Sequence, residues 1–448
     1  MVSNVRFAIC LTLLFSAVLT ACGRGLSSSV SGNSPGTSSS GNPGSSGSQP
    51  GGGSSGGSGA GSGSSGGSSP VTASGGQYIY IGDPDKLQID GFKVNGDGTL
   101  LPVPGSPFQM PGQGEPFQTA GDTLAVVGQF LFANATSGPS GLSGFKIDST
   151  NGSLTPVNTS SNTTGSWFLL AGNSQQNVLY TSGNVNMVSN GGFSSINALA
   201  AYSVASDGSL TPVSTVEMQN NQPIAGAIAV DHQSRFLYSW VSGRIYVFTL
   251  NGGAIGSQVS GSPFMISTAY QPVSPSDPNA CFGASFKPVL AVDPAGGRFL
   301  YASCDANAQV DEIAVSDAGQ LSLIGTVPSP GPSTELSSLT VSGDGALLFG
   351  TEEEANNVLS FKIDRSTGQL TLAGTEAAGT RPNQAASDAS SRFLYATNGS
   401  SNVSKNNFHP GSNNVSEYAV MTAGMMTPLS DSPKTVGSRP ASVISVKF

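Results

Sequence analysis

The sequence has 448 residues, of which 10% are Asp, Glu, Lys or Arg and 60 are Gly. This low charge argues against a coiled coil or a helical solenoid, because those folds need many Ala, Glu, Lys and Leu residues. The formal net charge of −9 argues against nucleic-acid binding, which usually requires a basic surface. Only two histidines occur, His232 and His409. We therefore expect no metal centre and no cofactor.

Residues 1–22 have the pattern of a secretory signal peptide. Arg6 precedes an apolar stretch, residues 7–19, which is shorter than the ~20 residues of a transmembrane helix. The stretch ends in Leu19-Thr20-Ala21-Cys22, which resembles the lipobox of bacterial lipoproteins, whose cysteine carries the lipid. We therefore expect an exported protein anchored to the cell envelope through Cys22. Gly23, where an Asp would favour the inner membrane, implies by the same resemblance the outer membrane, facing the periplasm or the surface. An ordinary signal peptide is the alternative.

Residues 23–76 are predicted to form a disordered tether. Gly, Ser and Pro occupy 40 of the 48 positions from 23 to 70, and Arg24 is the single charged residue there. Such a segment cannot bury enough apolar surface to offset its ordering entropy, and its reach is roughly 40 Å. Cys281 and Cys304 lie beyond the tether. They are candidates for a disulfide because export places them in an oxidising compartment.

Residues 77–448 repeat with a period of roughly fifty residues, which is typical of propellers and solenoids. An apolar triplet that ends in an aromatic residue marks each repeat. The triplets are Tyr78-Ile79-Tyr80, Phe130-Leu131-Phe132, Val178-Leu179-Tyr180, Phe236-Leu237-Tyr238, Phe299-Leu300-Tyr301, Leu347-Leu348-Phe349 and Phe393-Leu394-Tyr395. A segment of alternating apolar and polar residues follows each triplet and indicates a half-buried strand. A tight turn such as Asp207-Gly208 and an outer strand complete the repeat.

A short strand also precedes each triplet except the first, so each repeat predicts four antiparallel strands, the blade of a β-propeller. The predicted order is inner strand, triplet strand, third strand and outer strand. Residues 441–448 follow the last outer strand and match the inner strand that the first repeat lacks. We therefore predict an all-β, seven-bladed β-propeller whose C-terminal strand pairs into blade one and closes the ring, which removes free sheet edges. A β-sandwich of many short strands is the alternative.

Long insertions fall on one face of the predicted propeller. They occupy residues 182–197, 261–286 and 397–413, after a triplet strand or after an outer strand. Binding residues commonly sit on loops held by a rigid scaffold, and one-sided insertions in a repeat protein often mark the binding face. We therefore expect a ligand site on this face, with neutral loop drift as the alternative.

The residues just before the inner-strand prolines reach the same face near the mouth of the central channel. They are Glu115, Gln222, Lys287, Arg381 and Arg439. The three cations of this set are suited to hold a carboxylate or a phosphate. Ordinary solvated charge at the rim is the alternative.

The same face carries further candidates for chemistry. Glu352, Glu353 and Glu354 follow the sixth triplet, and a carboxylate there is suited to general-base work or Ca²⁺ binding, with a solvated acidic loop as the alternative. His409 lies in the last insertion and is a candidate base. Arg381, Arg439, His409 and Glu352 are thus the candidate catalytic residues. No Ser-His-Asp order, zinc spacing or phosphate-binding loop occurs.

The recurring motifs also point to a known family. Phe393-Leu394-Tyr395, Ser360-Phe361-Lys362-Ile363-Asp364, Gly208-Ser209-Leu210-Thr211-Pro212-Val213 and Gly261-Ser262-Pro263-Phe264 together resemble the lactonase-like seven-bladed propellers, which include the propeller type of 6-phosphogluconolactonase and YVTN-type surface proteins. The resemblance implies hydrolysis of a sugar lactone. Enzymes of the family tend to carry Pro-Arg-His before an inner strand, whereas this chain has Arg381-Pro382-Asn383 and Arg439-Pro440-Ala441, so no catalytic residue is carried over.

Three functions follow as hypotheses. The first is a membrane-tethered propeller that binds a small molecule, a glycan or a protein through its insertion-rich face. The second is a lactonase-like hydrolase, and the third is a structural protein displayed on the cell surface. We expect a monomer whose membrane contact is the lipid on Cys22.

Overall fold

The computed structural model describes one folded unit, and every described residue belongs to Ser69–Phe448. The described ranges are 76–110, 123–134, 142–159, 166–189, 192–218, 226–241, 243–265, 289–303, 309–330, 336–399 and 411–448. Several sequence predictions therefore lie outside the described residues. These are the signal peptide, the tether, Cys22, Glu115, Gln222, Cys281, Lys287, Cys304 and His409. Among the described residues, no helix has the length and apolar character needed to cross a membrane.

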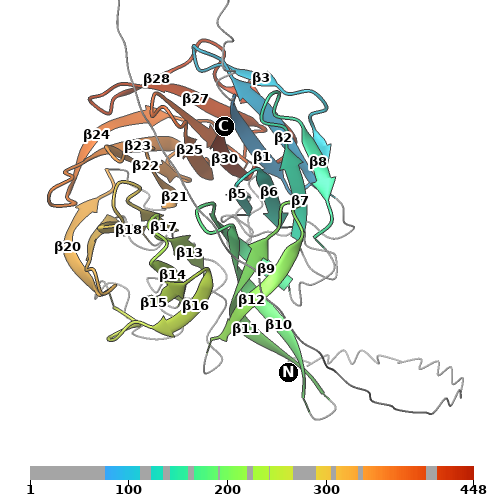
Figure 1. Ribbon diagram of the computed structural model, residues 1–448. Coiled ribbons are helices and arrows are strands. Elements are labelled where there is room, and N and C mark those ends of the chain that lie inside the picture. Colours follow the sequence, from blue (N-terminus) through green and yellow to red (C-terminus); the bar gives the residue numbers. More distant parts are fainter. Residues whose placement is uncertain are drawn as a thin grey trace, which may run out of the picture. The chain divides into compact units, whose positions relative to one another are not determined.

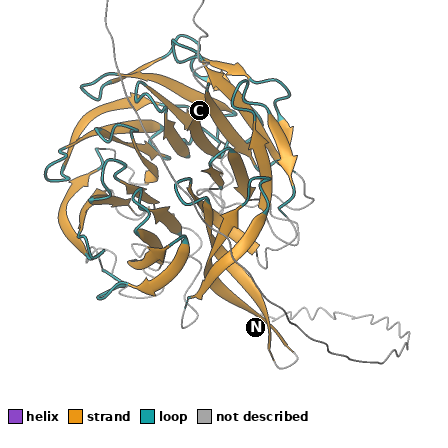
Figure 2. Cartoon of the chain, in the orientation of Figure 1, coloured by secondary structure: helices purple, strands orange, loops and turns teal. Residues whose placement is uncertain are grey.

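The described residues form seven small antiparallel sheets arranged as the blades of a propeller, which confirms the predicted fold class (Figures 1 and 2). The inner strands are, from blade one to blade seven, β30 (Ser442–Lys447), β5 (Leu124–Val127), β9 (Ser166–Asn173), β13 (Ala227–Val230), β17 (Val289–Val292), β21 (Leu336–Val341) and β25 (Gln384–Ser387). The triplet strands are β1 (Gln77–Asp83), β6 (Phe130–Asn134), β10 (Val178–Ser189), β14 (Phe236–Val241), β18 (Phe299–Ser303), β22 (Leu347–Glu352) and β26 (Phe393–Thr397).

The other two strands of each blade lie farther from the channel. The third strands are β2 (Gln88–Val94), β7 (Leu142–Ile147), β11 (Gly192–Val204), β15 (Arg244–Asn251), β19 (Gln309–Val315), β23 (Asn357–Ile363) and β27 (Asn414–Val420). The outer strands are β3 (Leu100–Pro102), β8 (Leu154–Val157), β12 (Leu210–Glu217), β16 (Ala254–Gln258), β20 (Leu321–Pro328), β24 (Leu370–Ala377) and β28 (Met426–Pro428). Two short strands, β4 (Phe108–Gln109) and β29 (Lys434–Thr435), extend blades one and seven.

The ring closes as the sequence predicts. The C-terminal strand β30 pairs with β1 along its whole length, with Tyr78 opposite Val446 and Tyr80 opposite Ile444. Each inner strand contacts the inner strands of both neighbouring blades, so the contacts run all round the channel. The first and last strands of the folded unit thus share one blade.

Glycines in the turn between the third and outer strands let adjacent blades approach closely. All seven adopt positive φ, from 77° to 91°, and they are Gly98, Gly152, Gly208, Gly253, Gly319, Gly368 and Gly424. A Cβ on Gly98 would overlap the ring of Phe393, which begins the triplet of the preceding blade. The same contact joins Gly368 to Phe299. A side chain at these positions would therefore be strained and would also separate two blades.

Buried tyrosines at the third triplet position join the same pairs of blades. Four of the five hydroxyls donate to the carbonyl of the turn glycine in the next blade: Tyr80 to Gly152 at 2.8 Å, Tyr180 to Gly253 at 2.9 Å, Tyr301 to Gly368 at 3.1 Å and Tyr395 to Gly98 at 2.6 Å. The fifth, that of Tyr238, makes no hydrogen bond among the described residues. Burial raises the pKa of the Tyr180 phenol to about 12, so it remains a donor at neutral pH. The last of these bonds ties blade seven to blade one.

Blade six shows how the contact is kept without a tyrosine. Its triplet ends in Phe349, which has no hydroxyl. Ser360, on the neighbouring strand β23, donates from Oγ to the Gly424 carbonyl of blade seven at 2.5 Å. The turn carbonyl is therefore satisfied from a different strand, as buried backbone groups require.

Two glutamates on third strands also reach the next blade. Glu312 accepts a hydrogen bond from the Leu370 N–H at 2.7 Å. Glu417 occupies the matching position in blade seven, immediately before an aromatic residue, and is completely buried. Neither of its carboxylate oxygens has a well-formed hydrogen bond within the described part of the chain. Burial, with the nearby Asp431 carboxylate, raises the pKa of Glu417 from 4.5 to about 7.

Ionisation of Glu417 should weaken the joint between blades seven and one. Because its pKa is higher in the folded state than in the unfolded chain, the carboxyl stabilises the fold below about pH 4.5, and this stability is lost as pH rises through 7. We expect Glu417→Gln to be more stable than the wild type at pH 8 by roughly 1–3 kcal/mol, and the gain to vanish near pH 4. Urea unfolding at several pH values measures this, with exposed Glu217→Gln as the control. A gain independent of pH would contradict the assignment.

The predicted insertion at 182–197 has a defined form. Strands β10 and β11 pair from Val178 opposite Ser203 to Ser189 opposite Gly192, so the insertion lengthens a hairpin of blade three. This hairpin extends beyond the ring of strands (Figure 1). The other two predicted insertions fall largely outside the described residues.

Candidate functional site

The candidate site lies where the chain passes from one blade to the next. We call the residues between an outer strand and the following inner strand an entry segment. Entry segments share a face with the turns that follow the triplet strands. The triplet and outer strands of a blade run in the same direction, so both end on that face. Arg381 lies in the entry segment of blade seven and Arg439 in that of blade one. Both are among the sequence-predicted ligand residues.

Arg381 is held by a buried carboxylate. Its Nε and Nη2 atoms donate to Oε1 of Glu353 at 3.0 and 2.6 Å, and only 13% and 3% of the two side chains are exposed. The backbone N–H of Arg381 donates to Oδ1 of Asn356 at 2.7 Å, and its φ is 57°. Asn356 and Glu353 belong to the turn after β22. The guanidinium is thus fixed from both its backbone and its side chain.

Arg439 forms a second ion pair on the same face. Its Nε lies 2.9 Å from Oδ1 of Asp85, which is in the turn after β1, and 42% of the Asp85 side chain is exposed. The buried Asp83 carboxylate accepts the backbone N–H groups of Ser438 at 2.5 Å and of Arg439 at 3.3 Å. Arg439 is therefore positioned like Arg381, by a turn carboxylate and by a second side chain that binds its backbone.

The two arginine segments are neighbours. The side-chain amide of Asn383, two residues after Arg381, donates to the carbonyl of Ala441, two residues after Arg439. The Val443 N–H donates to Oε1 of Gln384 at 2.9 Å. The structure therefore brings two of the five predicted ligand residues to one part of the rim. The other three lie outside the described residues.

The inner strand of blade six, β21, contacts the same rim. Ser337 donates from Oγ to the Pro382 carbonyl at 2.8 Å and shares a 2.8 Å hydrogen bond with Thr351. Thr351 in turn donates to the Asn383 carbonyl at 3.2 Å. These hydroxyls fix the backbone that follows Arg381. Blades six, seven and one thus form a continuous, hydrogen-bonded part of the mouth.

The three glutamates after the sixth triplet have different environments. Glu352 is buried and accepts from the Ser329 hydroxyl and, at 3.3 Å, from the side-chain amide of Asn357. Glu353 is buried and binds Arg381, and Glu354 is exposed. The interpretation as a solvated acidic loop is therefore wrong for Glu352 and Glu353. The sequence predicts Glu352 as a catalytic candidate but does not indicate that Glu353 pairs with Arg381, although Glu353, like Asp85, lies in the turn after a triplet strand.

The ends of the blade-seven insertion lie between the two arginine segments. The side-chain amide of Asn398 donates to Oδ1 of Asn414 at 2.7 Å and to Oγ of Ser416 at 2.9 Å. Gly399 lies so close to Pro440 that a Cβ on it would overlap the Pro440 backbone. The insertion therefore leaves and rejoins the blade at the rim. His409 belongs to this insertion but lies outside the described residues.

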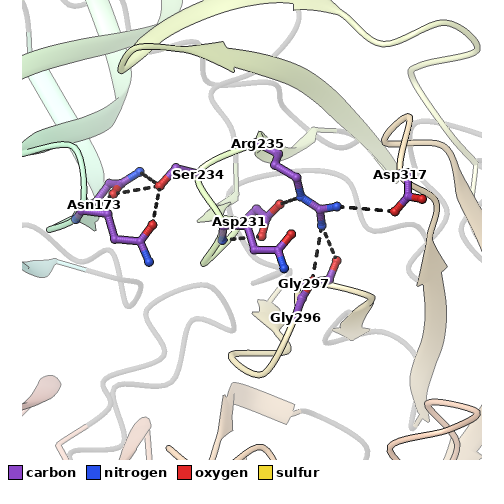
Figure 3. Close-up of polar contacts among 9 residues, drawn as sticks. Asn173, Asp231, Ser234, Arg235, Gly296, Gly297 and Asp317 are labelled. Carbon is purple, nitrogen blue, oxygen red and sulfur yellow. Dashed lines mark hydrogen bonds and ion pairs between the residues drawn. The ribbon is translucent and has the colours of Figure 1, made fainter.

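The opposite face carries a polar network that joins blades rather than a rim of entry segments (Figure 3). Asn173 of blade three donates to Oγ of Ser234 at 2.8 Å. Arg235 lies 2.6 Å from the Asp231 carboxylate and donates to the Gly297 carbonyl of blade five at 3.1 Å. Asn173 ends β9, and Asp231, Ser234 and Arg235 occupy the turn between β13 and β14. The Asn173–Ser234 and Arg235–Gly297 hydrogen bonds each join two adjacent blades.

No cluster of three His, Cys, Asp or Glu side chains suited to a metal ion occurs among the described residues. The polar groups assembled at the rim are instead two guanidinium groups, carboxylates, side-chain amides and hydroxyls. Such groups recognise an oxygen-rich organic ligand by directed hydrogen bonds, and guanidinium groups bind carboxylates and phosphates with the strongest of these.

The fold and its closure define a seven-bladed β-propeller. The family model described as "Lactonase, 7-bladed beta-propeller" matches residues 129–269 and 285–421, which is more than half of the chain. The chain belongs to this lactonase family. No curated protein matches it.

Solved structures share the fold at low sequence identity. A candidate 6-phosphogluconolactonase of Bacteroides fragilis is 17% identical with a TM-score of 0.60, covering 85% of this chain and 100% of that one. A protein of Lactobacillus plantarum is 15% identical with a TM-score of 0.61, covering 83% and 100%. The periplasmic gluconolactonase PpgL of Pseudomonas aeruginosa is 16% identical with a TM-score of 0.57, covering 83% and 99%. These likenesses establish the fold.

The buried Arg381–Glu353 pair should contribute to stability in a way that a double-mutant cycle reveals. Arg381→Ala leaves the Glu353 carboxylate buried without its cation, and such a loss typically costs about 3–5 kcal/mol. Adding Glu353→Gln should restore part of this loss, because the buried charge is then removed. Urea unfolding measures both variants. Arg439→Ala serves as the comparison and should cost about 1 kcal/mol or less, because Asp85 is partly solvated. Equal losses in the two single variants would contradict the burial argument.

Proposed function

We propose that this protein is an exported propeller of the lactonase family that binds a sugar-derived acid or its lactone at the mouth formed by blades six, seven and one. The observation that carries the proposal is the placement of Arg381 and Arg439 on adjacent entry segments joined by the Asn383–Ala441 hydrogen bond. Two oriented guanidinium groups on one rim suit a ligand carboxylate or a polarised carbonyl oxygen.

The Arg381 contacts leave donors for a ligand. Its hydrogen bonds to Glu353 use Nε and Nη2, whereas a guanidinium carries five N–H groups. A ligand oxygen can therefore approach Nη1 while the ion pair stays intact. Because Glu353 already fixes the side chain, binding would cost little further rotamer entropy.

Hydrolysis of the bound lactone is the second candidate function, and family membership favours it. The periplasmic gluconolactonase PpgL shares the fold. In such a reaction Glu353 would accept a proton from the attacking water, and Arg381 would stabilise the negative oxygen that forms at the carbonyl carbon. Collapse of this intermediate would break the bond between the carbonyl carbon and the ring oxygen, and the ring oxygen would take the proton held by Glu353. The opened product is the free acid that the rim is proposed to bind.

Ligand binding should depend on the rim arginines. We expect the purified protein to bind D-gluconate in isothermal titration calorimetry, and Arg439→Ala to weaken binding at least tenfold, because a charged hydrogen bond contributes about 1.5–3 kcal/mol. The double variant Arg381→Ala/Glu353→Gln should weaken it similarly. Arg298→Ala, an exposed arginine on the opposite face, is the matched control.

The outcome separates the three functional hypotheses. Hydrolysis of glucono-δ-lactone that is lost in the rim variants would support the enzyme. Binding without hydrolysis would support a binding protein. No binding of gluconate, 6-phosphogluconate or either lactone would contradict the proposal and would leave the structural display protein.

We further propose that a lipid on Cys22 holds the propeller at the outer membrane and that residues 23–76 act as a flexible spacer. The lipobox-like Leu19-Thr20-Ala21-Cys22 and the Gly/Ser-rich composition support this proposal. Export would place the propeller where soluble sugar acids and lactones of the envelope reach its mouth.

The anchor can be tested apart from ligand binding. In cells given a radiolabelled fatty acid, the wild type should carry the label and sediment with membranes, because acyl chains contribute about 0.8 kcal/mol per buried CH₂. Cys22→Ser should lose the label and appear in the soluble extracytoplasmic fraction. Cys281→Ser is the matched control and should keep the label. A labelled Cys22→Ser protein, or an unlabelled wild type, would contradict the anchor.

A further inference from the structure

A cavity lies in the channel directly below the rim. Its volume is about 270 Å³, and it lies among four consecutive inner strands, β21, β25, β30 and β5. Its lining residues are Leu124, Leu339, Thr340, Gln384, Ala385, Ala386, Ser387, Val443, Ile444 and Ser445. Gln384 lies three residues after Arg381, and Val443 lies four residues after Arg439. The two arginine segments therefore lead from the rim into this cavity.

Within the described part of the chain, the lining contains polar side chains but no charged one. Thr340, Gln384, Ser387 and Ser445 supply hydroxyl and amide groups, and none of the ten lining residues is charged. The hydroxyl of Ser445 is buried and has no hydrogen-bond partner in the described part of the chain. Each inner strand is also the terminal strand of its sheet, so one edge of its backbone lacks a strand partner. The Ser445 hydroxyl and these backbone edges therefore offer neutral donors and acceptors to a ligand.

We propose that this cavity is a subsite for the hydroxyl groups of an unphosphorylated sugar acid or lactone, whose carboxylate or carbonyl end binds at the arginine rim. The inference rests on the proposed function. A volume of about 270 Å³ lies just below the range of ~300–1,000 Å³ typical of drug-sized ligands, which suits one monosaccharide unit.

Because none of the described lining residues is charged, the cavity should favour an unphosphorylated ligand over a phosphorylated one. A phosphate at the far end of the ligand would enter the cavity without a cation, and an unpaired buried charge is strongly unfavourable. A hydroxyl at the same place would instead form hydrogen bonds with Ser445 or Thr340. The site should therefore prefer D-gluconate to 6-phosphogluconate, although the charged rim alone would favour the ligand with more negative charge.

Calorimetry on the full chain tests the subsite with three probes: D-gluconate, 6-phosphogluconate and pentanoate, a carboxylate without hydroxyls. We expect gluconate to bind at least tenfold more tightly than 6-phosphogluconate. Thr340→Val and Ser445→Ala should each weaken gluconate binding about threefold to tenfold, as expected for loss of a neutral hydrogen bond. Pentanoate binding should not change in these variants. Thr427→Val, an exposed outer-strand residue, is the control, and melting temperatures confirm folding.

The outcomes distinguish the subsite from the proposed function. If 6-phosphogluconate binds as tightly as gluconate, or if both channel variants bind gluconate normally while Arg439→Ala does not, the subsite is wrong and the rim site stands. If pentanoate binding falls with gluconate binding in the channel variants, the effect is structural and the subsite is wrong. If none of the three acids binds, the proposed function and the subsite both fail.

Discussion

The contact between each turn glycine and the preceding blade is the constraint on which the structure depends. A propeller blade cannot bury both of its faces alone, so its stability comes from the blades beside it. The glycine lets the turn of one blade rest on the first triplet residue of the blade before it, as Gly98 rests on Phe393. The tyrosine hydroxyl then satisfies the carbonyl of that same turn. Packing and hydrogen bonding thus act at one point, and blade six keeps the bond through Ser360 when tyrosine is missing.

Closure of the ring also builds the candidate site. The strand that completes blade one comes from the C-terminus, and the segment that leads into it contains Arg439. Its position is fixed by Asp83 on β1, at the other end of the folded unit. The rim between blades seven and one therefore forms only when the first and last strands meet. Loss of closure would remove the rim arginine pair together with the inter-blade bond from Tyr395, so the candidate site and global stability are coupled at this joint.

The fold could be predicted from the sequence because its determinants repeat. The triplet and the turn glycine each recur seven times, so the local sequence pattern alone indicates the number of blades. The spare C-terminal strand then indicates how the ring closes. The rim could be predicted only in part. The entry-segment arginines were identified from their place before a proline, but their partners were not, because Glu353 and Asp85 come from turns whose distance to the arginines depends on how blades pack. The burial of Glu352 and Glu353 was misjudged for the same reason, since a run of three acids resembles a solvated loop until its neighbours are known.

Family membership and function rest on different residues in this protein. The residues that recur across its blades, such as Tyr395 and Gly98, form the joints between blades. The rim residues Arg381 and Glu353 occur once, in one turn and one entry segment. They lie above a cavity whose described lining residues are all uncharged. In the proposed function, the charged mouth and the uncharged cavity would distinguish the two ends of a ligand, which a uniformly basic pocket could not do. On that proposal, the few residues that line the channel below the rim would set whether the ring binds a phosphorylated or an unphosphorylated ligand.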